Sequence, residues 1–204
     1  MHITKDRIFT CSAIALSFTI GGITVYGGLH LKNQLNKAVK YDTLQTRVSY
    51  HEQAEHINAY YFTLGDRTNV AVIRETLQAV DTILPKYFPD GPYQRKDLIA
   101  LAMAESSFDQ YLVGSHKEFG IFQLLPESCR WAGIRKNQFD IRVNTEMALF
   151  VLHQKYEERK EYKKAIIAYN GYVIKKGKVS DIYWKRFLKF RRVLDDILPD
   201  TTTN

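Results

Sequence analysis

The distribution of apolar and polar residues divides the chain into three parts between two short tails. Residues 8–29 contain no charged residue and no histidine, which is typical of a membrane-spanning helix. Residues 30–68 are polar, with only a patchy heptad of apolar positions, and predict a partly helical stalk or linker. From residue 69 to 198, apolar positions recur every three or four residues, which indicates a helical domain. The tails are residues 1–7 and 199–204.

The apolar segment at residues 8–29 favours an uncleaved transmembrane anchor over a signal peptide. At about 1.5 Å per residue it would form about 33 Å of helix, enough to cross a hydrocarbon core of about 30 Å. The apolar region of a signal peptide is normally shorter and closes with a small-x-small cleavage site, and no convincing site of this kind closes the segment. Basic residues flank both ends, so the positive-inside rule does not decide the orientation.

The helical domain is predicted to be all α or nearly so. Its first helix is marked by apolar residues at spacings of three and four, at Val70, Ile73, Leu77, Val80 and Leu84. Breakers are expected to end this helix at Pro85, Pro89, Gly91 and Pro92. Further helices are predicted at residues 94–108, 127–133, 145–158, 161–170 and 181–198, with irregular, glycine-containing sequence between the first two. No segment shows the long alternation of a β-strand.

Composition adds a basic balance and little metal-binding chemistry. The chain has 29 Lys and Arg against 22 Asp and Glu, a formal net charge of +7. A basic surface suits an anionic partner, but charge alone does not choose among nucleic acid, phospholipid headgroups and a wall polymer. Cys11 and Cys129 lie in different parts of the chain, so no disulfide is expected between them. No Cys or His pair has zinc spacing, and we expect no metal and no cofactor.

The helix predicted at 94–108 carries the main candidate for acid chemistry. Leu98, Leu101 and Ala102 share a face with Glu105, and the helix is apolar nearly all round, which is typical of a buried helix. Apolar surroundings disfavour a charged carboxylate, so the pKa of Glu105 should rise, as a general acid working near neutrality requires. The structural alternative is a core glutamate that is paired with a Lys or Arg.

Three short motifs follow one another in a specific order. They are Glu105-Ser106-Ser107-Phe108, then Gly120-Ile121-Phe122-Gln123 with Pro126, and finally Ala168-Tyr169-Asn170-Gly171, with Asp140 and Asn144 between the last two. Each motif is weak alone, but their order in a helical domain of this size is informative. In this respect residues 70–198 resemble the soluble-lytic-transglycosylase-like (SLT) domain of the lysozyme superfamily.

The resemblance implies a membrane-anchored lytic transglycosylase, a lyase that cleaves the MurNAc-GlcNAc β-1,4 bond of peptidoglycan. Glu105 would protonate the glycosidic oxygen and then act as base on the muramic C6 hydroxyl, which closes a 1,6-anhydro ring without water. The hydroxyl of Tyr169 is expected to reach Glu105 and hold its orientation. The remaining motif residues are expected to bind the glycan, at Ser106, Phe119, Gly120, Phe122, Gln123 and Asn170.

The segment before Gly120 departs from the family pattern. Many members have a Gly-Ala pair here, whereas this chain has Glu118 two residues before Gly120, where animal-type lysozymes place a catalytic Asp. A second carboxylate flanking the bond suits hydrolysis. One alternative is therefore a muramidase that uses Glu105 and Glu118, and Glu118 is otherwise a solvated loop residue. A further alternative is a non-catalytic glycan-binding or assembly protein on the same scaffold.

The basic, aromatic C-terminal segment is interpreted as the last core helix. Its core positions are predicted at Trp184, Phe187, Leu188, Leu194 and Ile197. Direct nucleic-acid binding is therefore not expected. The expected partners are peptidoglycan glycan strands and a lipid bilayer that is crossed by residues 8–29. This arrangement predicts a single-pass membrane protein with its domain on the cell-wall side. A phage virion or a conjugation machinery is an open alternative for its setting.

Overall fold

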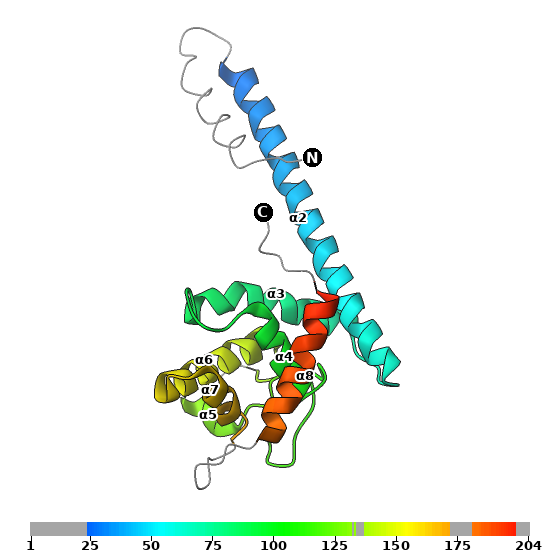
Figure 1. The fold of residues 1–204 in the computed structure, drawn as a ribbon. Helices are drawn as coiled ribbons and strands as arrows, with labels where there is room; N and C mark the ends of the chain where they lie inside the picture. Colours follow the sequence, from blue (N-terminus) through cyan, green and yellow to red (C-terminus); the bar gives the residue numbers. More distant parts are fainter. Residues whose placement is uncertain (1–23, 132, 134–136, 172–180, 199–204) are drawn as a thin grey trace. The chain divides into compact units, whose positions relative to one another are not determined.

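The computed structural model describes residues 24–131, 133, 137–171 and 181–198 (Figure 1). Within these residues the chain forms helices and only isolated extended pairings, in which Phe119 faces Val113 and Leu124. The helices are α2 (Thr24–Thr63), α3 (Val70–Tyr87), α4 (Arg95–Glu105), α5 (Pro126–Trp131), α6 (Ile141–Arg159), α7 (Tyr162–Tyr169) and α8 (Asp181–Ile197). The described part is therefore mainly α, as the sequence predicted, and is consistent with a lysozyme-like fold.

Contacts group the chain into two compact units, residues 1–47 and 48–204. In the first unit, residues 24–47 belong to α2, and the apolar side chains of Leu35 and Val39 are 64% and 59% exposed. Most of the predicted anchor, and both predicted tails, lie outside the described residues. In the part of the chain that is described, no helix combines the length and apolar character needed to span a bilayer.

The second unit includes the end of α2. The end of α2 contributes Ala54, Ile57 and Tyr61 to the core of this unit, each at most 1% exposed. The hydroxyl of Tyr61 donates a hydrogen bond to the carbonyl of Met103 in α4 at 3.3 Å. These three residues form a helical stripe at spacings of three and four. The polar sequence around them hides this stripe from a simple hydrophobicity pattern.

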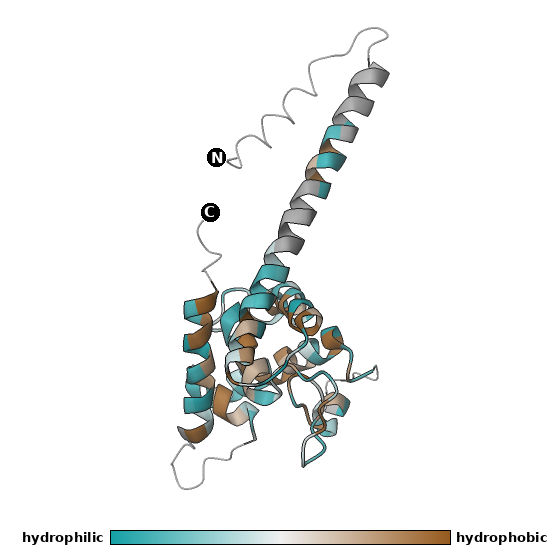
Figure 2. Ribbon diagram, turned by 90° about the vertical axis from the view of Figure 1, so that its right-hand side faces the viewer, coloured by the Kyte–Doolittle hydropathy of each residue, from teal (hydrophilic) through white to brown (hydrophobic). Residues whose placement is uncertain are grey.

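Helix α4 lies at the centre of the second unit, and every residue from Lys96 to Ala104 is buried. It packs against α3 and α8, while α6 packs against α3, α5 and α7. Figure 2 shows hydrophobic residues of this unit interleaved with hydrophilic ones along the same helices. The expectation of a buried helix that carries Glu105 is therefore confirmed.

Two helix ends differ from the prediction. Pro85 does not end α3, because it lies inside the last turn and the helix continues to Tyr87. Pro85 has no N–H to donate within the helix, but the last turn is still closed by the N–H of Phe88, which donates to the carbonyl of Leu84 at 3.0 Å. Helix α4 ends at Glu105 instead of continuing to residue 108, since Ser107 and Phe108 adopt left-handed φ angles of 54° and 64°.

Candidate active site

Glu105 is the last residue of α4 and lines an open cleft. The helix ends directly after it, and the backbone N–H of Ser106 still donates to the carbonyl of Ala102 at 3.2 Å. The cleft has a volume of about 230 Å³, and its other charged or polar walls come from Glu118, Gln123, Tyr169 and Asn170. The end of the buried helix thus places a partly buried carboxyl at a surface that a ligand can reach.

Neutral donors, not a cation, hold the carboxyl of Glu105. The hydroxyl of Tyr183 donates a short hydrogen bond to Glu105 Oε1, and Asn170 Nδ2 donates to the same oxygen at 3.4 Å. Among the described residues, no lysine or arginine forms an ion pair with Glu105. The structural alternative, in which a basic residue neutralises a core glutamate, therefore does not describe this site.

Burial raises the pKa of Glu105 above its ordinary value. The hydrogen bonds from Tyr183 and Asn170 and the positive charge of Arg186 oppose this rise, while the negative charge of Glu118 adds to it. Burial and the carboxylate of Glu105 also raise the pKa of Tyr183 well above its ordinary value, so Tyr183 keeps its proton and remains a donor. The site therefore makes Glu105 a weaker acid than an exposed glutamate, while its charged form is still partly stabilised.

Glu118 lies on another wall of the same cleft and behaves in the opposite way. Its desolvation is the largest single influence and would raise its pKa. Hydrogen bonds from backbone N–H groups and the contact with His116 together hold the pKa below its ordinary value. The N–H of His116 donates to Glu118 Oε2 at 2.8 Å, and His116 Nδ1 lies 3.2 Å from Oε1. The pKa values of the two carboxyls in the cleft are thus displaced in opposite directions, upward for Glu105 and downward for Glu118.

Gly114 leaves room for the side chains of Glu118 and Gln123. A Cβ at position 114 would lie 2.5 Å from Glu118 Oε2 and 2.7 Å from Gln123 Oε1, closer than real Cβ contacts allow. Both side chains therefore rest against the bare backbone of Gly114. Gln123 is fixed further by its Nε2, which donates to the carbonyls of Gly120 and Leu112 at 2.9 and 3.2 Å.

Asn144 of α6 supports the loop that presents Gln123. Its Oδ1 accepts the N–H of Phe122 at 2.9 Å, and its Nδ2 donates to the carbonyls of Phe119 and Gln138 at 3.3 and 3.1 Å. The same side chain fills the space where a Cβ of Gly120 would stand, with Nδ2 only 2.6 Å away, and Gly120 has a φ of 76°. The position of the Asn144 side chain therefore requires a glycine at residue 120.

Several of the predicted glycan-binding residues do not line the cleft. The side chains of Phe119 and Phe122 are 4% and 0% exposed, and Gly120 is also buried. The hydroxyl of Ser106 donates to the carbonyl of Ile121 at 2.7 Å, which ties the first motif to the second. The structure places these residues as supports, while the cleft itself is lined by Gln123 and Asn170.

Tyr169 lines the cleft, but its hydroxyl has a different acceptor from the one expected. It donates to the carbonyl of Phe122 at 3.0 Å, and the hydrogen bond expected at Glu105 comes from Tyr183 instead. Tyr169 is still close enough to Glu105 for that carboxylate, after burial, to raise its pKa well above the ordinary value. Tyr169 thus joins the second and third motifs beside the acid.

Tyr183 is the functional residue that sequence reasoning missed. It begins the buried stripe of α8, followed by Phe187, Phe190 and Leu194, and is 5% exposed. Its sequence signal was weak but present, because it is the one hydroxyl-bearing side chain in this stripe. A buried tyrosine hydroxyl needs an acceptor, and Glu105 supplies it. In the same helix, Phe187 and Leu194 are buried as predicted, and Trp184, Leu188 and Ile197 are partly buried against the core.

Comparison with known proteins agrees with these motifs. Residues 93–182 match the family model of the transglycosylase SLT domain. No curated protein and no solved structure matches the chain. The matched segment contains Glu105, Glu118 and Gln123, as well as Tyr169 and Asn170 at the end of α7. It stops one residue before Tyr183. The resemblance to the SLT domain that was predicted from the motifs is therefore confirmed over residues 93–182.

Proposed function

We propose that the transglycosylase SLT domain of this chain cleaves the MurNAc-GlcNAc β-1,4 bond of peptidoglycan by lytic transglycosylation. The family match supports a glycan-cleaving enzyme of this type. One observation carries the proposal to the residue level: Glu105 stands in an open cleft, is held by neutral donors, and has a raised pKa. A carboxyl in this state is suited to donate a proton near neutral pH.

Glu105 first donates a proton and then takes one back. Among the described residues, Tyr183 and Asn170 both donate their hydrogen bonds to Oε1 of Glu105. Oε2 is therefore the oxygen available to carry the proton. That proton passes to the glycosidic oxygen as the C1–O bond breaks, and C1 acquires oxocarbenium character. The carboxylate then takes the proton of the muramic C6 hydroxyl, whose oxygen bonds to C1. Glu105 ends protonated and no water is consumed.

The surroundings of Glu105 suit both steps. Burial keeps the proton on the acid before cleavage, while Tyr183 and Arg186 stabilise the carboxylate that cleavage leaves behind. Tyr183 does not line the cleft, so it acts as a positioning residue through Glu105. Gln123 and Asn170 present amide groups in the cleft, where they hydrogen-bond to the sugars on either side of the bond.

Substitution of Glu105 tests the proposal against a non-catalytic role. In zymography of the full chain on peptidoglycan, Glu105→Gln should abolish lysis, because the amide has no proton to donate to the glycosidic oxygen. Glu127→Gln is the matched control, since Glu127 is exposed on α5 and pairs only with Arg130 at 2.9 Å among the described residues. Lysis by Glu105→Gln at the rate of the control would reject Glu105 as the acid, and the absence of lysis by the parent chain itself would support a glycan-binding or assembly protein.

Glu118 supports hydrolysis as a second candidate function. The pKa values of Glu105 and Glu118 are displaced in opposite directions within one cleft, a pattern typical of an acid paired with a charged carboxylate. In a muramidase, Glu118 would stabilise the positive charge at C1 or activate water. Glu118→Gln should leave anhydro products unchanged if the enzyme is a transglycosylase. If hydrolysis is the reaction, this variant should lose the reducing-end products.

The location of the domain is also part of the proposal. We propose that residues 8–29 anchor the chain in a membrane and that the domain lies on the cell-wall side, where its polymer is. An anchored domain of this size would confine cleavage to a small area of wall, which suits local opening in phage entry or lysis, or in conjugation. Protease treatment of intact spheroplasts should degrade the domain, and protection of the domain would reject this orientation.

A further inference from the structure

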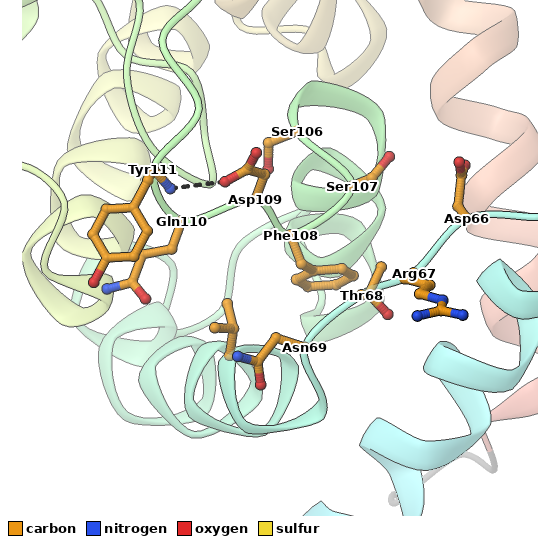
Figure 3. A pocket seen from close by; sticks show the side chains of 11 residues that line it. Asp66, Arg67, Thr68, Asn69, Ser106, Ser107, Phe108, Asp109, Gln110 and Tyr111 are labelled. Carbon is orange, nitrogen blue, oxygen red and sulfur yellow. Dashed lines mark hydrogen bonds between the residues drawn. The ribbon is translucent and has the colours of Figure 1, made fainter.

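A second pocket, of about 420 Å³, is lined by the segment that directly follows Glu105 (Figure 3). Residues 66–69, which connect α2 to α3, form one wall, and residues 106–111 form the other. The pocket shares no lining residue with the cleft that contains Glu105. It is thus a separate cavity, and one of its lining segments, residues 106–111, follows Glu105 directly in the chain.

The walls of this pocket are held in place by the core. Phe108 is 2% exposed and packs edge-on against Tyr61, with ring centroids 6.4 Å apart. On the facing wall, Thr68 donates to Asn58 Oδ1 at 2.8 Å, and Asn69 Oδ1 accepts the N–H of Ala71 at 2.9 Å. Both segments are therefore ordered before any ligand arrives, which lowers the entropic cost of binding.

Tyr111 offers a flat aromatic surface at the edge of the pocket. Its side chain is 71% exposed, although its position is fixed from two sides. Asp109 Oδ1 accepts the backbone N–H of Tyr111 at 2.9 Å, and the Tyr111 ring leans on Phe139 with centroids 5.9 Å apart. An exposed aromatic ring that is already immobilised is suited to stack against the C–H face of a sugar ring.

The polar groups of the pocket suit a polyhydroxylated ligand more than a polyanion. Arg67 supplies donors, while Asp66 and Asp109 supply acceptors, and all three are exposed. Gln110 adds an amide whose Nε2 is bound to the carbonyl of Phe139 at 2.8 Å. Figure 3 shows Gln110 beside Tyr111 at one end of the pocket, with Asp66 and Arg67 at the other. Two carboxylates against one guanidinium repel phosphates and carboxylates, yet they hydrogen-bond well to hydroxyl and acetamido groups.

We propose that this pocket is a secondary binding site for the glycan of peptidoglycan, with one sugar stacked on Tyr111. Arg67, Asp109 and Gln110 hydrogen-bond to the hydroxyl and acetamido groups of that sugar. The identity of the polymer rests on the proposed function, whereas the pocket itself does not. A second attachment point on the polymer holds the domain on the wall between cleavage events, because the cleft then meets the strand at a high effective concentration.

Binding to insoluble peptidoglycan tests this site without turnover. In the full chain carrying Glu105→Gln, Tyr111→Ala should weaken cosedimentation with purified sacculi about fivefold, the size expected for one lost stacking contact. Phe62→Ala is the matched control, since Phe62 is 72% exposed and lines neither cavity. Equal binding by Tyr111→Ala and its parent, or an equal loss in the control, would overturn the proposal.

Two further experiments identify the ligand and distinguish this proposal from the proposed catalytic function. Glycan strands stripped of stem peptides should bind and show the same dependence on Tyr111, while free stem peptide should not bind. The opposite pattern would assign the pocket to peptide and reject the glycan site. With Glu105 intact, Tyr111→Ala should cleave a short soluble fragment at the parental rate. Continued cleavage by Glu105→Gln would reject the proposed function and leave the binding result standing.

Discussion

The substitution Tyr183→Phe isolates the hydrogen bond that tunes the acid. Tyr183 is 5% exposed and donates to Glu105 Oε1, so phenylalanine keeps the packing and removes one donor to the carboxylate. A hydrogen bond to a charged group contributes about 1.5–3 kcal/mol, and one pKa unit corresponds to about 1.36 kcal/mol. Because Glu105 borders an open cleft, water will replace part of the lost bond. We therefore expect an effect near the lower end of this range.

The loss of Tyr183 should be visible in the pH profile. Tyr183 lowers the pKa of Glu105 against the rise caused by burial, so its removal should raise that pKa further. Since cleavage needs protonated Glu105, activity falls on the alkaline side as this group ionises. The alkaline limb of kcat should therefore move up by about one pH unit.

The plateau value of kcat should fall as well, because a weaker acid transfers its proton more slowly. KM should stay constant, since Tyr183 does not line the cleft. The assay is the rate of soluble muropeptide release across pH by the parent and Tyr183→Phe. An alkaline limb that stays in place, or a change confined to KM, would refute this reasoning.

Three other substitutions test separate parts of the account. Gly114→Ala should lower kcat/KM about tenfold with little change in the circular dichroism spectrum, because its Cβ would displace Glu118 and Gln123 from the cleft wall. Asn144→Ala should lower the free energy of unfolding in urea by about 3 kcal/mol, since two buried hydrogen bonds to the Gln123 loop and one to the carbonyl of Gln138 are lost. Glu105→Gln should raise Tm by a few degrees at neutral pH. A glutamate whose pKa is raised by folding destabilises the fold as pH rises above its ordinary value, and this gain should therefore vanish in acid.

Much of the helical fold could be predicted from periodicity alone. The stretch around Leu98 and Leu101 is apolar on nearly every side, and such a helix has to be buried. This reasoning correctly placed Glu105 at the end of the central helix. The apolar pattern did not indicate the buried stripe of Ala54, Ile57 and Tyr61, because polar side chains surround these residues in the sequence.

The site was less predictable, because a motif identifies residues without giving the direction of their side chains. Ser106 and Phe122 belong to motifs, yet both are buried and support the loops. Gln123 and Asn170 belong to the same motifs and line the cleft. The bond from Tyr183 to Glu105 joins residues 78 positions apart, a separation at which periodicity carries no information.

The central claim is that Glu105 alone moves the proton and that the muramic C6 hydroxyl, not water, attacks C1. Mass spectrometry of peptidoglycan fragments released in ¹⁸O-labelled water tests this claim most directly. We expect 1,6-anhydro ends without ¹⁸O from the parent chain and no release by Glu105→Gln. Reducing ends that carry ¹⁸O would contradict it, as would release that continues without the carboxyl of Glu105.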